Sequence, residues 1–133
     1  MAQRRQDLER LGLVVRAGQR QPISAAVAWE RLVFVSGQVP MRAGAPSAPD
    51  IAGQTHAVLD GIAATLAEAG CTLADVVKTT VWLTDAADYP AFNAAYGERF
   101  GVDAAPARST VIAGLIAPVK VEIEAMAVRP APA

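Results

Sequence analysis

The stretch IAGQTHAVLDGIAATLAEAGCTLADVVKTTVWLT, residues 51–84, decides the fold, because two different hydrophobic periodicities follow each other in it. In its first half apolar residues recur at steps of three and four, which predicts an amphipathic helix over residues 51–69. Asp50 stands at the N-cap position and Gly70 at the C-cap position of this helix. The predicted apolar face consists of Ile51, Val58, Leu59, Ile62, Ala63 and Leu66.

In the second half the pattern changes to alternation, which predicts a half-buried strand over residues 76–84. One face of this strand is expected to carry Val77, Thr79, Val81 and Leu83. The other face is expected to carry Lys78, Thr80 and Trp82. A helix that leads directly into a strand indicates helices packed against a sheet.

Two strands are predicted before this unit. Residues 23–29 and 32–35 are rich in β-forming side chains and are separated by Glu30-Arg31, which favours a hairpin.

After the unit, a second helix is predicted over residues 89–100, with Asp88 as its cap and Pro90 in its first turn. Residues 108–113 and 119–128 then read as two strands, because both are rich in β-branched residues and the second one alternates. The apolar stripe of the helix consists of Phe92, Tyr96 and Phe100.

The element order is therefore ββαβαββ, which predicts an α+β fold with two helices packed on one face of a mixed sheet. On the opposite face Trp82, Met126 and Val128 lie together with charged side chains, so we expect other subunits to cover this face. A single domain is expected over residues 19–129, between an N-terminal tail or edge strand (1–18) and a C-terminal tail (130–133).

Composition excludes several functional classes. The chain has 133 residues, 53% of them hydrophobic and 19% charged, which is typical of a globular domain. A net charge of −1 gives no field that would attract nucleic acid or an anionic membrane. No apolar run reaches the length of a membrane span or a signal segment, so a cytoplasmic location is expected. The chain has one cysteine, Cys71, so no internal disulfide is expected. It also has one histidine, His56, so no metal site with Cys/His spacing is expected.

Few side chains stand out as candidates for chemistry. Arg108 shares a predicted strand face with Thr110, so a guanidinium and a hydroxyl can converge on one small anion. The same pattern also fits an arginine that pairs with a surface carboxylate. Glu122 lies on the same strand face as Glu124, where a carboxylate either orients water or simply faces solvent.

Two weaker candidates lie elsewhere in the chain. Ser36-Gly37 ends a predicted strand, where a glycine lets a ligand approach backbone N–H groups, although a plain turn explains it nearly as well. Asn93 lies beside the apolar stripe of the second helix, where its amide serves either a subunit boundary or the solvated surface.

Five segments in order resemble the RidA/YjgF family over nearly the whole of residues 23–128. They are VFVSGQVP (33–40), VVKTTVWLTD (76–85), FNAAYGERF (92–100), PARSTV (106–111) and VEIEAMA (121–127). The resemblance implies a chorismate-mutase-like fold, a homotrimer with three clefts between subunits, and no cofactor. It also implies hydrolytic deamination of reactive 2-imino and enamine acids to 2-oxo acids and ammonia, a role in metabolite damage control.

The resemblance assigns roles to individual positions. Arg108 would pair bidentately with the substrate carboxylate, and Glu122 would hydrogen-bond the attacking water. The other positions implied to bind substrate are Ser36, Gly37, Asn93 and Thr110.

Two segments depart from the family pattern. QPISAAV (21–27) places Ile23 where a tyrosine usually lines the site, which predicts a bulkier or more hydrophobic imino acid as substrate. Residues 114–119 differ from the common Leu-Pro version and are one residue shorter, which is expected to move the strand that carries Glu122. Alternative functions are a non-catalytic module that binds 2-oxo acids or other small carboxylates, an endoribonuclease, and a chaperone-like protein.

Overall fold

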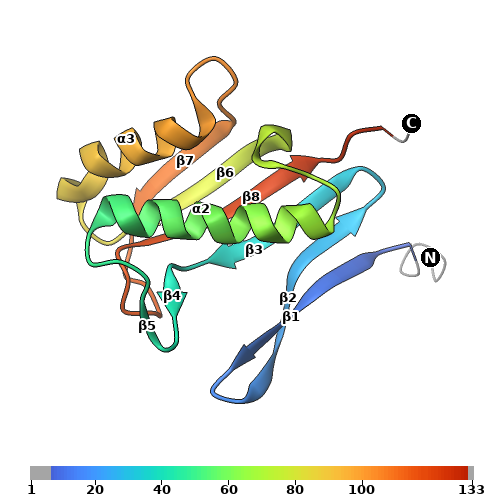
Figure 1. Ribbon diagram of the computed structural model, residues 1–133, viewed down its shortest axis with the longest axis horizontal. Coiled ribbons are helices and arrows are strands. Elements are labelled where there is room, and N and C mark those ends of the chain that lie inside the picture. The colour runs from blue at the N-terminus through green and yellow to red at the C-terminus, as the bar shows by residue number, and fades with distance from the viewer. Residues whose placement is uncertain (1–6, 132–133) are drawn as a thin grey trace.

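The structure, a computed structural model, describes residues 7–131 (Figure 1). Its elements are β1 (Glu9–Arg16), β2 (Gln19–Trp29), β3 (Leu32–Gln38), β4 (Met41–Arg42), β5 (Ala45–Pro46), α2 (Ile51–Glu68), β6 (Val76–Leu83), α3 (Tyr89–Phe100), β7 (Ala107–Ile112) and β8 (Val121–Val128), with 3-10 turns at Leu73–Asp75 and Ala86–Asp88. The expected tails, 1–18 and 130–133, lie partly outside the described residues, and within the first of them residues 9–16 form β1.

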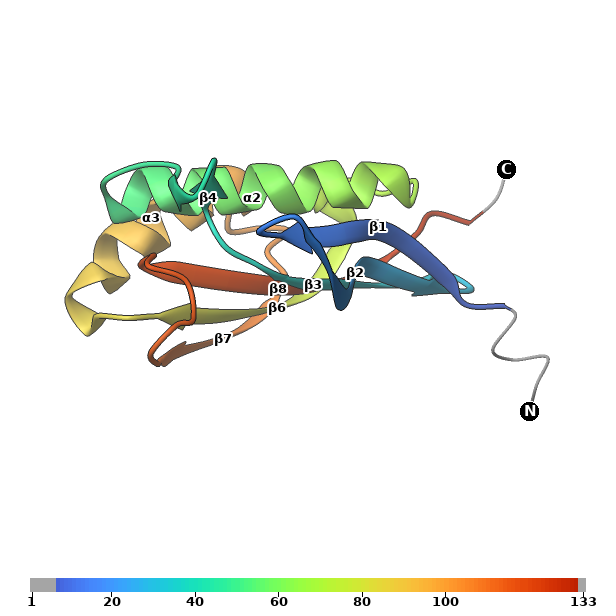
Figure 2. The same cartoon turned by 90° about the horizontal axis from the view of Figure 1, so that it is seen from below.

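Six strands form one sheet in the order β1-β2-β3-β8-β6-β7, and β4 and β5 form a separate small hairpin. β6 and β7 are parallel, whereas the other neighbours in the large sheet are antiparallel. Figure 2 shows both helices on one side of this sheet. The predicted α+β fold, with two helices on one face of a mixed sheet, is therefore confirmed.

Local sequence explains how α2 begins and ends. The Asp50 side chain accepts a hydrogen bond from the Gly53 amide at 2.8 Å, which satisfies a free N–H of the first turn. At the other end, Gly70 has a φ of 78°, a conformation that glycine adopts without strain, and the Cys71 amide bonds back to the Leu66 carbonyl. Gly70 thus follows the C-cap, which is Ala69.

The predicted N-cap residue of α3 is confirmed by position but not by a capping hydrogen bond. Asp88 precedes the helix as expected, but its side chain makes no capping hydrogen bond. Asp85 instead accepts from the Ala87 amide at 2.9 Å and caps the 3-10 turn that leads into α3. The segment therefore contains two helix starts, and only the earlier one has a side-chain capping bond.

One residue of β6 also differs from the prediction. The register between β6 and β8 shifts between Val76 and Lys78, which is a β-bulge. As a result Val76 is buried while Val77 is 47% exposed, so Val77 does not share the buried face of Thr79. Beyond the bulge the predicted alternation holds.

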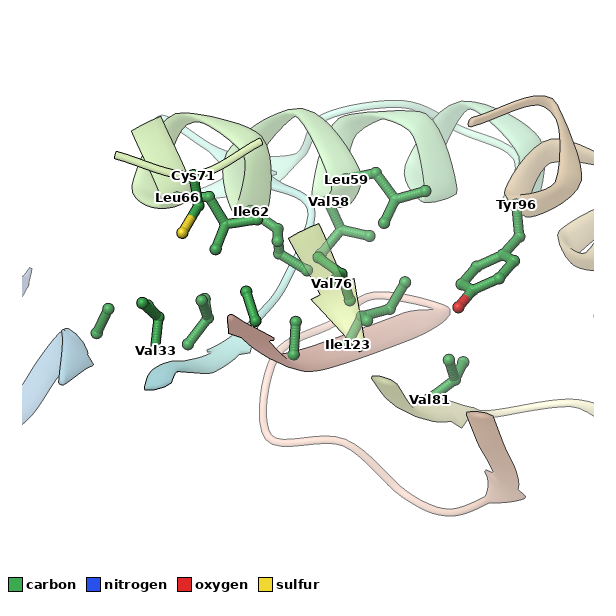
Figure 3. Close-up of a cluster of buried hydrophobic side chains, with 14 of the residues drawn as sticks. Val33, Val58, Leu59, Ile62, Leu66, Cys71, Val76, Val81, Tyr96 and Ile123 are labelled. Carbon is green, nitrogen blue, oxygen red and sulfur yellow. The ribbon is translucent and has the colours of Figure 1, made fainter. Parts of the chain in front are cut away.

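The core lies between the helices and the sheet (Figure 3). Val58, Leu59, Ile62 and Leu66 of α2 point down onto the sheet, and Val33, Val81 and Ile123 point up from three different strands. The helices are tied to each other by an ion pair between Arg99 and Asp60 at 2.8 Å. This packing holds α3 against the sheet, and pairing with β6 holds β7; α3 and β7 carry the first part of the candidate site.

Within residues 7–131, no helix covers the opposite face of the sheet. Phe34 and Met126 are paired across β3 and β8 on this face, and they are 41% and 37% exposed. This is the face for which the sequence predicts cover by other subunits. In the described part of the chain, neither helix is long and apolar enough to cross a bilayer.

Candidate functional site

Arg108 lies on the edge strand β7, beneath helix α3. It pairs in register with the buried Thr79 of β6, so its side chain is on the helix face of the sheet. The centre of its guanidinium lies 4.7 Å from the Tyr96 ring, 5.4 Å from the Phe92 ring and 5.7 Å from the Tyr89 ring. These three rings attract the cation electrostatically and restrict its position.

The rings of Tyr89, Phe92 and Tyr96 form an aromatic wall beside Arg108, and hydrogen bonds hold its two tyrosines in place. The Tyr96 hydroxyl is bonded to the Thr79 hydroxyl at 2.7 Å, below the helix. Burial raises the pKa of Tyr96, while the Thr79 hydrogen bond and the nearby Arg108 oppose the rise. The hydroxyl of Tyr89 accepts a hydrogen bond from Nη2 of Arg108 at 2.8 Å. The guanidinium is therefore fixed at one nitrogen and stacked near three rings.

Asn93 and Thr110 lie near this arginine. Asn93 lines a hollow of about 430 Å³ with Arg108, Tyr96 and Pro106. Thr110 shares the strand face of Arg108, and its buried Oγ1 has no hydrogen-bond partner within residues 7–131. The predicted pairing of Arg108 and Thr110 on one face is thus present in the structure.

Glu122 lies in a different hollow, of about 530 Å³, on the uncovered face of the sheet. Ile23, Ser36 and Gly37 line the same hollow. The carboxylate of Glu122 lies directly over Gly37, where a Cβ atom would clash with Oε2. The Ser36 hydroxyl donates to the Ser24 carbonyl at 2.6 Å, so its proton is already engaged by the protein.

Burial raises the pKa of Glu122 above its ordinary value. The positive charge of Arg16 opposes this rise, and the negative charge of Glu124 adds to it. Both neighbours line the hollow with Glu122. A carboxylate with a raised pKa is a better proton acceptor, which is the property that general base catalysis needs.

The two hollows share no residue and lie on opposite faces of the sheet. Glu122 pairs with Trp82 of β6, whereas Arg108 pairs with Thr79, an odd number of residues away. Side chains alternate along a strand, so the two charged groups point in opposite directions, with β6 between their strands. One chain alone does not bring Arg108 and Glu122 together.

Sequence reasoning missed three residues near the two charged groups: Tyr89 and Tyr96, which contact Arg108, and Arg16, which lines the Glu122 hollow. The spacing of Tyr89, Phe92 and Tyr96 by three and four residues places them on one helix face, and this was the available signal. That Arg108 faces this stripe depends on tertiary packing. Arg16 is brought to Glu122 only by the β1–β2 hairpin.

The other singled-out side chains lie outside both hollows. Cys71 is buried, and burial first and Asp75 second raise the pKa of its thiol, which makes it unreactive. His56 forms a surface contact with Glu98 at 3.0 Å between α2 and α3.

Comparisons with known proteins identify relatives of the chain. The family model described as Endoribonuclease L-PSP matches residues 15–129. A RutC family protein of Pyrococcus abyssi is 40% identical over 111 residues, which are 81% of this chain and 87% of that protein. The 2-iminobutanoate/2-iminopropanoate deaminase of Escherichia coli is 41% identical over 102 residues, which are 74% of this chain and 80% of that enzyme.

Solved structures show the same fold. The crystal structure of a YjgF family member from Neisseria meningitidis superposes with a TM-score of 0.80 at 31% identity, covering 95% of this chain and 98% of the other. Because the family match spans most of the chain and the relatives agree with it, the protein belongs to the RidA/YjgF family.

Proposed function

We propose that the protein hydrolyses reactive 2-imino and enamine acids to 2-oxo acids and ammonia, in clefts between the subunits of a homotrimer. The observation that carries the proposal is the pair of incomplete hollows. One hollow holds Arg108 with no carboxylate among its lining residues, and the other holds Glu122, a carboxylate of raised pKa, together with Arg16 but without Arg108. Contact between two copies completes a site that one copy lacks.

Arg108 binds the substrate carboxylate in this proposal. A guanidinium matches a carboxylate with two parallel hydrogen bonds, and its aromatic surroundings reduce the motion lost on binding. Asn93 and Thr110 border the same ligand from α3 and β7. On the neighbouring subunit, the backbone at Ser36 and Gly37 faces the ligand from the opposite side.

The chemical step needs only water and a proton acceptor. A protonated imine carbon is electrophilic, and Glu122 of the neighbouring subunit accepts a proton from water as its oxygen bonds to that carbon. The proton passes from Glu122 to nitrogen, and the C–N bond breaks as the hydroxyl oxygen forms the C=O bond. Ammonia leaves with the electron pair of the C–N bond and takes up the hydroxyl proton. The products are a 2-oxo acid and ammonium, so atoms and charge balance without a cofactor.

Ile23 sets the expected substrate range. It lines the Glu122 hollow together with Val14 and Val39, and these side chains offer no hydrogen bond to a substrate. We therefore propose a preference for imino acids with larger apolar side chains. Rates measured on imines made from alanine and from leucine test this preference, and faster turnover of the alanine imine would contradict it.

The proposed activity is tested by generating imino acids with an amino-acid oxidase and following semicarbazone trapping. Wild type is expected to remove the imine and reduce trapping, whereas Arg108→Ala is not. Arg31→Ala is a matched control, since Arg31 lies in the β2–β3 turn and lines neither hollow. Arg108-dependent binding of a 2-oxo acid without ammonia release would instead identify a non-catalytic carboxylate-binding module.

A further inference from the structure

Of the aromatic residues beside Arg108, Tyr89 is the one whose hydroxyl forms a hydrogen bond with the guanidinium. It opens α3, its amide bonds to the Ala86 carbonyl, and Pro90 follows it, so its backbone is fixed on both sides. Its ring packs against Phe92 at a centroid distance of 6.3 Å. The residue as a whole remains 40% exposed, so a ligand can reach it.

The direction of its hydrogen bond determines what the hydroxyl can still do. The guanidinium of Arg108 can only donate, so the Tyr89 oxygen accepts and its own proton points elsewhere. Within residues 7–131, no protein acceptor receives that proton. A hydroxyl that accepts from a cation is polarised and becomes a stronger donor.

We propose that Tyr89 is a further carboxylate-binding residue, whose hydroxyl donates to the anion held by Arg108. The Tyr89 oxygen and Nη2 lie 2.8 Å apart, so both donors can reach one carboxylate group. The hydroxyl thereby adds a third hydrogen bond to the two from the guanidinium. This inference rests on the proposed function, because it assumes that Arg108 binds a substrate carboxylate.

An alternative role for the Tyr89 hydroxyl predicts the opposite change in ligand affinity when the hydroxyl is removed. If the Tyr89 hydroxyl merely occupied Nη2 until a ligand displaced it, removing the hydroxyl would tighten binding. If it donates to the ligand, removing it weakens binding. Tyr89→Phe keeps the ring beside Arg108 and Phe92 and removes only the hydroxyl, so it separates the two cases.

The experiment measures the dissociation constant of 2-oxobutanoate by calorimetry for wild type, Tyr89→Phe and Ser109→Ala. Ser109 is the matched control, because its hydroxyl neighbours Arg108 in sequence but bonds to Lys78 on the other strand face. We expect Tyr89→Phe to weaken binding about tenfold, as a lost hydrogen bond to a charged group does. Ser109→Ala is expected to bind as wild type does.

Two further readouts separate this inference from the proposed function. The neutral amide of 2-oxobutanoic acid should bind wild type and Tyr89→Phe equally, since it lacks the anion. In imine hydrolysis, Tyr89→Phe should raise KM with little change in kcat. Unchanged or tighter binding of 2-oxobutanoate by Tyr89→Phe overturns the inference and leaves the deaminase proposal standing. Tyr89-dependent binding without turnover supports the inference and overturns the deaminase, and absence of any binding by wild type overturns both.

Discussion

The carboxylate of Glu122 lies over Gly37, in space that is free only because residue 37 has no side chain. Gly37 belongs to β3 and Glu122 to the neighbouring strand β8, and the pairing between the two strands is irregular at this point. This irregularity places the backbone of residues 36–37 beside the carboxylate in one hollow. A glycine is therefore needed at position 37 to leave room for the Glu122 carboxylate, and not to form a turn.

Replacing Gly37 with alanine should therefore displace the Glu122 carboxylate. We expect turnover of imino acids to fall about 10- to 100-fold, because a misplaced base loses much of its catalytic contribution. Thermal denaturation should change little, since Gly37 has no positive φ that alanine would strain. Gly114→Ala is a control, because no atom lies within 4 Å of a Cβ there. Full activity in Gly37→Ala would mean that the position of this carboxylate is unimportant.

The position of the acid limb, the pH at which kcat/KM falls on the acid side, should depend on Arg16 and Glu124, the two charged neighbours of Glu122. Only ionised Glu122 accepts a proton, so kcat/KM should fall as pH drops through its raised pKa. Arg16 lowers that pKa, so Arg16→Gln should move the limb to higher pH. Glu124 raises it, so Glu124→Gln should move the limb to lower pH. Shifts in the same direction in both variants would contradict the assignment of this limb to Glu122.

Glu122 should also reduce stability where it is ionised. Its folded-state pKa lies above the unfolded value, so the folded state binds the proton more tightly, and stability declines as pH rises through the folded pKa. Glu122→Gln cannot lose this stability. In urea denaturation at fixed protein concentration, the unfolding free energy of the variant minus that of wild type should therefore be larger at pH 7 than at pH 4. The opposite trend would mean that a partner stabilises the ionised carboxylate.

Arg108→Lys should lose most activity although it keeps the positive charge. An ammonium cannot reproduce the planar two-bond fork or the contact with three aromatic rings. We expect kcat/KM to fall about 10- to 100-fold, the effect of one lost charge-assisted hydrogen bond, while circular dichroism stays unchanged. Near-normal turnover would show that charge alone suffices at this position.

The fold was largely predictable because its periodic patterns are local. The alternation of Val121, Ile123 and Ala125 placed the buried face of β8, and the spacing in α2 placed its core face. Val77 was misplaced because a β-bulge depends on the pairing partner, which the sequence of β6 does not contain. Asp88 is the N-cap residue of α3 as predicted, but the side-chain capping bond is made by Asp85 at the earlier turn.

The candidate site was predictable only in part. Alternation along β7 correctly put Arg108 and Thr110 on one face, but tertiary packing brings Tyr89 to Arg108 and Arg16 to the Glu122 hollow. The opposite orientation of Arg108 and Glu122 follows from the register of three strands, which no single segment encodes. The assignment of Arg108 and Glu122 to one shared site stays a prediction.

Mixing two inactive variants tests that shared site most directly. Arg108→Ala and Glu122→Gln are unfolded and refolded together, so that subunits exchange at random, and imine hydrolysis is compared with that of each variant alone. If a cleft takes Arg108 from one subunit and Glu122 from its neighbour, the mixture should recover about a quarter of wild-type activity, because half of each position is intact. No recovery, although native mass spectrometry shows mixed oligomers, would contradict a site built from two subunits.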